Sequence, residues 1–115
     1  MQISERKVGG ITIIDVSGRF AAGDGAGRLK DKVTSLVFQG EKQIILNVGN
    51  LSYVDSMGLG EMVASHLTAS KAGSTLKLAN IGKRLQDLLV MTKLLAVFES
   101  HDSEDEAVAS FARTD

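Results

Sequence analysis

A serine followed by two glycines lies where an apolar segment of the chain passes into an amphipathic one. Ser56 belongs to the segment Leu51–Gly60, which reads Leu-Ser-Tyr-Val-Asp-Ser-Met-Gly-Leu-Gly. It therefore lies at or beside the N-terminus of the following helix, where unpaired backbone N–H groups and the helix dipole favour an anion. Gly58 and Gly60 leave the first turn without side chains, so that another molecule can approach the backbone. This arrangement suits a phosphate on Ser56, which would meet those amides.

The carboxylate of Asp55 directly precedes this serine. It would repel a phosphoserine, but it can also orient the serine hydroxyl, or a metal-bound nucleotide, during phosphoryl transfer. A third role is structural, because Asp and Ser are both common helix caps. The residue types leave these roles of Asp55 and Ser56 open.

A small serine hydrolase is the enzymatic alternative, since Ser56 follows an expected strand and opens an expected helix. The nucleophile elbow of such enzymes needs Gly-x-Ser-x-Gly, whereas position 54 is Val. A chain of 115 residues also offers little room for a separate acid and a histidine at the serine. These features favour a protein without catalysis of its own.

Other groups that can do chemistry are few. The chain has no cysteine, which excludes thiolate metal sites, and its two histidines, His66 and His101, are far apart in sequence. We expect His66 at the edge of the core and His101 in solvent. The segment Gly23–Gly27 fits neither the dinucleotide fingerprint nor the Walker pattern, so we interpret it as a partner-contact loop or helix entry that contains Asp24. No metal or cofactor site is predicted.

Hydrophobic periodicity predicts the elements that position Ser56. Two runs rich in β-branched residues, 3–8 and 11–17, flank Gly9-Gly10, which is typical of a β-hairpin. The apolar run 44–48 is typical of a strand covered on both faces. By the same reasoning we expect helices over 26–37, 58–72 and 83–92, strands at 75–79 and 97–98, and a last helix that begins with the capping box at Ser103.

A hairpin followed by alternating helices and strands indicates an α/β layer structure with right-handed crossovers. We expect a mixed sheet of four to five strands with about four helices, predominantly on one face, and with the 44–48 strand in the interior. The length suits a single domain over residues 1–115.

Composition excludes several classes of function. The formal net charge is -1 and the basic residues are scattered, so no positive face exists for nucleic acid. No apolar run approaches the roughly 20 residues that span a bilayer, and the N-terminus has no apolar stretch of signal-peptide length. We therefore expect a cytoplasmic protein.

The segment Leu51–Gly60, after its apolar strand, resembles the signature of the STAS, or anti-sigma factor antagonist, family. In that family an Asp-Ser-x-Gly-Leu segment carries the regulatory phosphoserine. The resemblance extends over almost the whole chain, because the hairpin, the Gly18 turn, the 44–48 strand, the Gly73 turn and the 94–98 segment follow the family's order.

This resemblance implies a function without enzymatic activity or cofactor. The unphosphorylated chain would bind a kinase-type anti-sigma factor and free a sigma factor, and phosphorylation of Ser56 by that kinase would end the binding. A separate serine phosphatase would restore the active form. The alternative within the fold is a constitutive scaffold or transporter-associated module that serine phosphorylation does not regulate.

The resemblance also implies a partner-binding face around Ser56, formed by Asp24, Tyr53, Asp55, Met57, Gly58, Leu59 and Gly60. Two positions depart from the family pattern, because many antagonists carry Asp where this chain has Asn47 and again where it has Ala21. Those family residues are thought to help arrange the nucleotide bound to the partner. Asp24 is the residue that can substitute in part.

Overall fold

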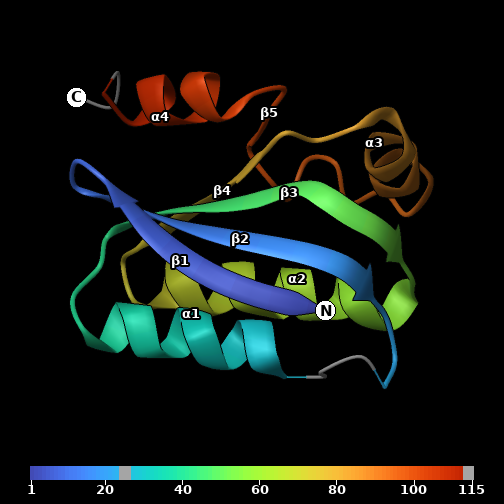
Figure 1. Ribbon diagram of the computed structural model, residues 1–115, viewed down its shortest axis with the longest axis horizontal. Coiled ribbons are helices and arrows are strands. Elements are labelled where there is room, and N and C mark those ends of the chain that lie inside the picture. Colours follow the sequence, from blue (N-terminus) through green and yellow to red (C-terminus); the bar gives the residue numbers. More distant parts are fainter. Residues whose placement is uncertain (24–26, 113–115) are drawn as a thin grey trace.

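Five strands form one mixed sheet in the computed structural model, which describes residues 1–23 and 27–112 (Figure 1). The first pair of strands is antiparallel and every other pair of neighbours is parallel. The strands lie side by side in chain order: β1 (Gln2–Val8), β2 (Ile11–Phe20), β3 (Gln43–Val54), β4 (Thr75–Ala79) and β5 (Ser100–His101). The predicted mixed sheet is confirmed.

Four helices cover this sheet over the described residues: α1 (Arg28–Phe38), α2 (Ser56–Lys71), α3 (Lys83–Met91) and α4 (Glu104–Ala112). In Figure 1, α1 and α2 lie below the sheet and α4 lies above it. Leu85 and Leu89 of α3 belong to the same apolar cluster as α1 and α2. Three helices therefore share one core, and the fold agrees with the prediction. None of these helices is long and apolar enough to span a membrane.

The β1–β2 hairpin turns at Gly9-Gly10, where Val8 pairs with Ile11 and Gly9 has φ 60°. The hairpin predicted from the glycine pair is therefore confirmed. β2 continues to Phe20, beyond the predicted end at residue 17. This extension matters because Phe20 lies under the start of α2.

Alternate residues of the central strands contribute their side chains to two separate apolar clusters. Ile14 and Leu46 face α1 and α2, in a cluster that contains most of the buried apolar side chains. Ile13 and Ile45 face the other way and pack with Phe111 of α4. As predicted, the 44–48 strand is interior, because its apolar side chains are at most 4% exposed.

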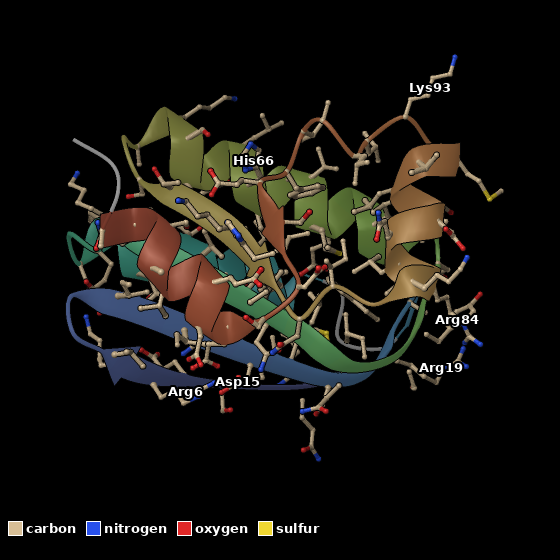
Figure 2. The ribbon with its side chains drawn as sticks, turned by 90° about the horizontal axis from the view of Figure 1, so that it is seen from above. Arg6, Asp15, Arg19, His66, Arg84 and Lys93 are labelled. Atoms are coloured by element: carbon tan, nitrogen blue, oxygen red, sulfur yellow. The ribbon has the colours of Figure 1, made fainter. Side chains whose placement is uncertain are left out.

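The face under α4 also holds charged groups. Lys77 on β4 is 3% exposed, and its Nζ donates to Ser110 Oγ at 2.7 Å and lies 4.1 Å from the centre of the Phe111 ring. The same ammonium pairs with Glu99 at 2.9 Å. On β1, the guanidinium of Arg6 donates to Asp15 and to Glu104 of α4, and Figure 2 shows Arg6 and Asp15 together beneath that helix.

Three expectations about individual residues are wrong. The last strand is Ser100–His101 and not 97–98, because Lys93 with φ 61° starts a turn that returns Phe98 to the core at 5% exposure. His101 is not solvated: its side chain is 15% exposed and its Nε2 lies 2.7 Å from a Glu99 carboxylate oxygen. The helical spacing of the 58–72 segment predicts Leu67 on its apolar face, but Leu67 is 47% exposed.

The longest strand, β3, extends well beyond its neighbour β4. β2 pairs with it as far as Val54, whereas β4 pairs only over Gln43–Asn47. Asn80, directly after β4, has φ 59° and donates from its side-chain amide to Asn47 Oδ1 at 2.8 Å. A Cβ at Gly49 would lie 2.9 Å from Asn80 Cβ, so glycine allows the two chains to touch there. At this corner the chain leaves the sheet after β4 and turns towards α3.

Candidate functional site

The junction between β3 and α2 places Ser56 at the first position of the helix, directly after its N-cap, Asp55. One carboxylate oxygen of Asp55 accepts a hydrogen bond from Gly58 N at 2.9 Å, and the other accepts one from Ala22 N at 3.1 Å. The backbone of Asp55 is also held, because its N–H donates to Phe20 O at 3.3 Å. Asp55 therefore ties the start of α2 to the end of β2 and leaves the side chain of Ser56 exposed.

The N–H groups of Gly58 and then of Ala22 hold the pKa of Asp55 below its usual range, because they stabilise the charged carboxylate. The helix N-terminus thus already carries an anion, which is a capping role for Asp55. This changes one expectation: a phosphate on Ser56 does not find a free amide at Gly58, since Asp55 occupies it.

The two glycines of the first turn have different surroundings. A Cβ on Gly58 would lie 2.0 Å from the carbonyl oxygen of Phe20, so this residue lets α2 pack against the backbone of β2. A Cβ on Gly60 would meet nothing within 4 Å. The expectation that both glycines expose the backbone to another molecule therefore fits Gly60 and not Gly58.

The remaining predicted contact residues also divide into exposed and buried ones. Met57 is 64% exposed and Tyr53 is 42% exposed, whereas Leu59 is 4% exposed and packs into the core beneath α2. Leu59 therefore supports the turn from inside and presents no side chain to a partner. Asp24 lies outside the described residues.

Ser56 opens onto a groove of about 420 Å³ between α2 and the segment that follows β2. The residues of α2 that line the groove are Ser56, Met57, Gly58, Gly60, Glu61 and Ala64, and their spacing places all but Gly58 on one helix face. The opposite side includes residues 20–23 and Lys30 of α1. A flat helix face at Gly60 and a single lysine thus border the serine.

Glu61, which sequence reasoning missed, fixes the far side of this groove. The N-cap of α1 is Gly27, which has φ 86° and offers no side chain to cap the helix. The carboxylate of Glu61 accepts instead from Gly27 N at 2.8 Å, Leu29 N at 2.8 Å and Lys30 N at 3.2 Å. A residue of α2 therefore caps α1. The sequence carried no local signal for this role, because the three amides lie 31 to 34 residues from Glu61.

On the other side of the junction, Arg19 and Tyr53 are paired across β2 and β3. The guanidinium carbon of Arg19 lies 4.7 Å from the centre of the Tyr53 ring, within the range of a cation–π contact. The positive charge of Arg19 also adds to the lowering of the pKa of Asp55, after the backbone N–H groups. A basic group and an aromatic ring thus flank the turn.

Three hydrogen bonds hold the side chain of Asn47. Its Nδ2 donates to Asp15 Oδ1 at 2.8 Å, and its Oδ1 accepts from Asn80 Nδ2 at 2.8 Å and from Gly49 N at 3.1 Å. An aspartate at this position would face the carboxylate of Asp15. Asn47, where many antagonists carry Asp, therefore avoids a repulsion with Asp15 on β2. Ala21 is 7% exposed, beside the amide that holds Asp55.

No group of His, Cys, Asp and Glu suited to a metal ion occurs among residues 1–23 and 27–112. His66 follows Ser56 by ten residues along α2, about 15 Å at the rise of an α-helix, and its ring lies edge-on to Phe98 at 5.4 Å. His101 contacts Glu99. The described residues therefore bring no histidine to Ser56.

Comparison with known proteins gives a consistent result. A family model described as the STAS domain matches residues 2–107. The putative anti-sigma factor antagonist BtrV of Bordetella bronchiseptica is 22% identical over 111 residues, 96% of this chain and 95% of that protein. The anti-sigma-B factor antagonist of Bacillus subtilis is 34% identical over 71 residues, 62% of this chain and 64% of that protein.

The fold also occurs in a solved structure, that of the Bacillus cell fate determinant SpoIIAA in its phosphorylated form. The TM-score is 0.72 at 20% identity, and the match covers 96% of this chain and 99% of that one.

Proposed function

Since the chain belongs to the STAS domain family, we propose that it is an anti-sigma factor antagonist that phosphorylation of Ser56 switches off. The observation that carries this proposal is the exposed serine at the first position of α2, on an open groove, next to a carboxylate that is already fixed. The two relatives named as anti-sigma factor antagonists support the class of partner. The solved phosphorylated relative supports the kind of modification.

In the unmodified state, the partner is a kinase-type anti-sigma factor that contacts Ser56 and its exposed apolar neighbours, Met57 and Tyr53. The kinase supplies ATP and the chemistry of transfer, and the antagonist supplies only the acceptor hydroxyl. A serine phosphatase removes the phosphate later. The protein acts in the cytoplasm, where its partner acts.

The fixed carboxylate of Asp55 explains how a phosphate would act without refolding the domain. Phosphorylation adds about -1.5 to -2 charges. Because Asp55 occupies the N–H of Gly58, that charge is not absorbed by the helix N-terminus and projects from the surface around Ser56. A partner that desolvates this surface would then bury an unpaired charge, which is costly.

The first test is phosphorylation itself. Wild-type protein, Ser56→Ala and Ser70→Ala are incubated with the purified candidate kinase and ATP, and intact mass is measured. Ser70 is an exposed serine at the other end of the same helix, so it controls for helix location. One added phosphate is expected on wild type and on Ser70→Ala, and none on Ser56→Ala. Phosphate on Ser56→Ala would disprove the assignment of the acceptor.

The second test is binding, measured by calorimetry at constant salt. Ser56→Ala is expected to bind the anti-sigma factor as wild type does. The phosphorylated protein is expected to bind at least about tenfold more weakly, or ~1.4 kcal/mol, and Ser56→Asp, with less charge, between the two. Equal affinity of the phosphorylated and unmodified forms would favour a constitutive scaffold or transporter-associated module.

A further inference from the structure

The free edge of β3 forms a second groove, separate from the one at Ser56. β4 pairs with β3 only as far as Asn47, whereas β2 accompanies β3 to Val54. Residues 48–54 therefore have a strand on one side only. Gly49 N donates to Asn47 Oδ1, so the open part of the edge begins at Asn50. Along such an edge alternate backbone N–H and C=O groups point away from the existing neighbour and can accept another strand.

The corner at Asn80 holds this edge open. The left-handed backbone of Asn80 and its hydrogen bond to Asn47 turn the chain away from β3 directly after β4. The chain then forms α3, which becomes the opposite wall of a groove of about 550 Å³. Figure 1 shows α3 beside the far end of β3, beyond β4. A strand edge that faces a helix across a groove is the geometry in which extended peptides bind by strand addition.

The walls of the groove are apolar. Leu51 and Val54 contribute from β3, and Leu88 and Met91 contribute from α3. Met91 is 79% exposed. An extended occupant presents alternate side chains to opposite sides, so every second residue of a bound segment would meet this apolar wall.

The rim carries positive charge. Arg84 is exposed and lines the groove, and Arg19 stacks on Tyr53, which lines it too. Asp87 also lines the groove, and its carboxylate accepts a hydrogen bond from Lys83 at 2.9 Å, which balances its charge. Figure 2 shows Arg19 and Arg84 at the same end of the molecule. This charge favours an acidic occupant.

We propose that the groove between residues 50–54 and α3 binds an extended segment of a partner protein, with alternating apolar and acidic residues, as an added strand of the sheet. The five edge residues span about 16 Å at 3.3 Å per residue, enough for a segment of similar length. This surface does not include Ser56 and shares Tyr53 with the face proposed to contact the anti-sigma factor, so the proposal does not depend on phosphorylation.

The test uses the peptide acetyl-Ser-Val-Glu-Val-Asp-Val-Ser-amide, added to ¹⁵N-labelled full-length protein up to about 1 mM. Amide resonances of residues 50–54 and 84–91 are expected to shift. A version of the peptide that is N-methylated at alternate residues keeps its side chains but loses backbone donors, and it is expected to bind at least about tenfold more weakly. Absence of shifts at these residues, or equal binding of the methylated peptide, would overturn the proposal.

Variants test the apolar and the charged parts of the groove separately for their effect on peptide binding. Met91→Glu is expected to abolish binding, whereas Phe38→Glu, at a residue 91% exposed at the end of α1, is expected to leave it unchanged. Arg84→Glu is expected to lose the acidic peptide and to bind a version with lysines in place of the acids. Circular dichroism checks that each variant folds. If Met91→Glu instead dissociates a dimer in sedimentation experiments, the occupant is a second copy of this chain and the proposal is wrong.

Discussion

The two faces of the sheet are closed in different ways. Under α1 and α2 the contact is almost entirely apolar, and close packing decides which side chain fits. Under α4 a small apolar cluster is completed by the buried ammonium of Lys77 and by the ion pairs of Arg6. The comparison teaches that a close steric fit at Gly58 and the hydrogen bonds of Asp55 fix the junction of β3 and α2, whereas α4 packs on long charged side chains. Substitutions on the two faces should therefore fail for different reasons.

The largest effect is expected at Gly58, on the apolar face. Gly58→Ala places a methyl group 2.0 Å from the carbonyl oxygen of Phe20, so α2 must move. We expect a loss of about 3 kcal/mol, at the upper end of overpacking costs, in urea denaturation.

Gly60→Ala is the matched control, since it adds the same methyl group to open space two residues later. It is expected to leave the protein as stable or to stabilise it by up to ~1 kcal/mol through helix propensity. Equal losses in the two variants would contradict a steric origin.

The charged face is examined at Lys77. Lys77→Ala removes the side chain that contacts Phe111 and Ser110, and we expect a loss of about 2 kcal/mol. Lys77→Met keeps the volume without the charge, and we expect its stability to stay within about 1 kcal/mol of wild type or to rise. Urea denaturation at neutral pH measures both. If the methionine variant is as unstable as the alanine variant, the ion pair and not the packing holds α4.

Asn47→Asp introduces a repulsion on the same face. Arg6 holds the pKa of Asp15 below its usual range, so Asp15 is charged at neutral pH and would face the new carboxylate. That repulsion should raise the pKa of the new carboxylate in the folded state. The protein then loses stability as pH rises through this pKa, by about 1.4 kcal/mol per unit of pKa shift. The variant should therefore be less stable than wild type at pH 7, and the deficit should shrink towards acid pH. Asn50→Asp, at an exposed site, should show no such trend.

The smallest effect is expected at Glu61, which is polar but belongs to the apolar face. Glu61→Ala removes the cap of α1 and should cost about 1 kcal/mol. Glu61→Gln keeps an acceptor oxygen and should cost less. Hydrogen exchange at Leu29 N and Lys30 N should accelerate in the alanine variant while distant amides of β3 keep their protection. Unchanged exchange at those two amides would show that Glu61 does not cap α1 in solution.

Much of this fold was predictable because its signals are local. The glycine pair at 9–10 defines a hairpin, and an apolar run such as 44–48 defines a buried strand whatever the rest of the chain does. The position of Ser56 at the start of a helix was equally local. The length of β3 was not, because Gly49 and Asn50 interrupt its apolar pattern and only pairing with β2 shows that the strand continues.

The features of the site that sequence reasoning missed all depend on residues distant in the chain. Gly58 has the appearance of an exposed glycine until Phe20 is placed beneath it. The carboxylate of Glu61 lies 34 residues from Gly27, whose N–H it accepts.

The cap that Glu61 provides has a consequence for the order of folding. Helix α1 lacks a capping side chain of its own, and isolated helices of its length are marginal in water. Its first turn gains full stability only when α2 has docked. The segment 28–38 should therefore be little helical as a free peptide. If the contact forms after the transition state for folding, Glu61→Ala should raise the unfolding rate of the intact protein and leave the folding rate almost unchanged.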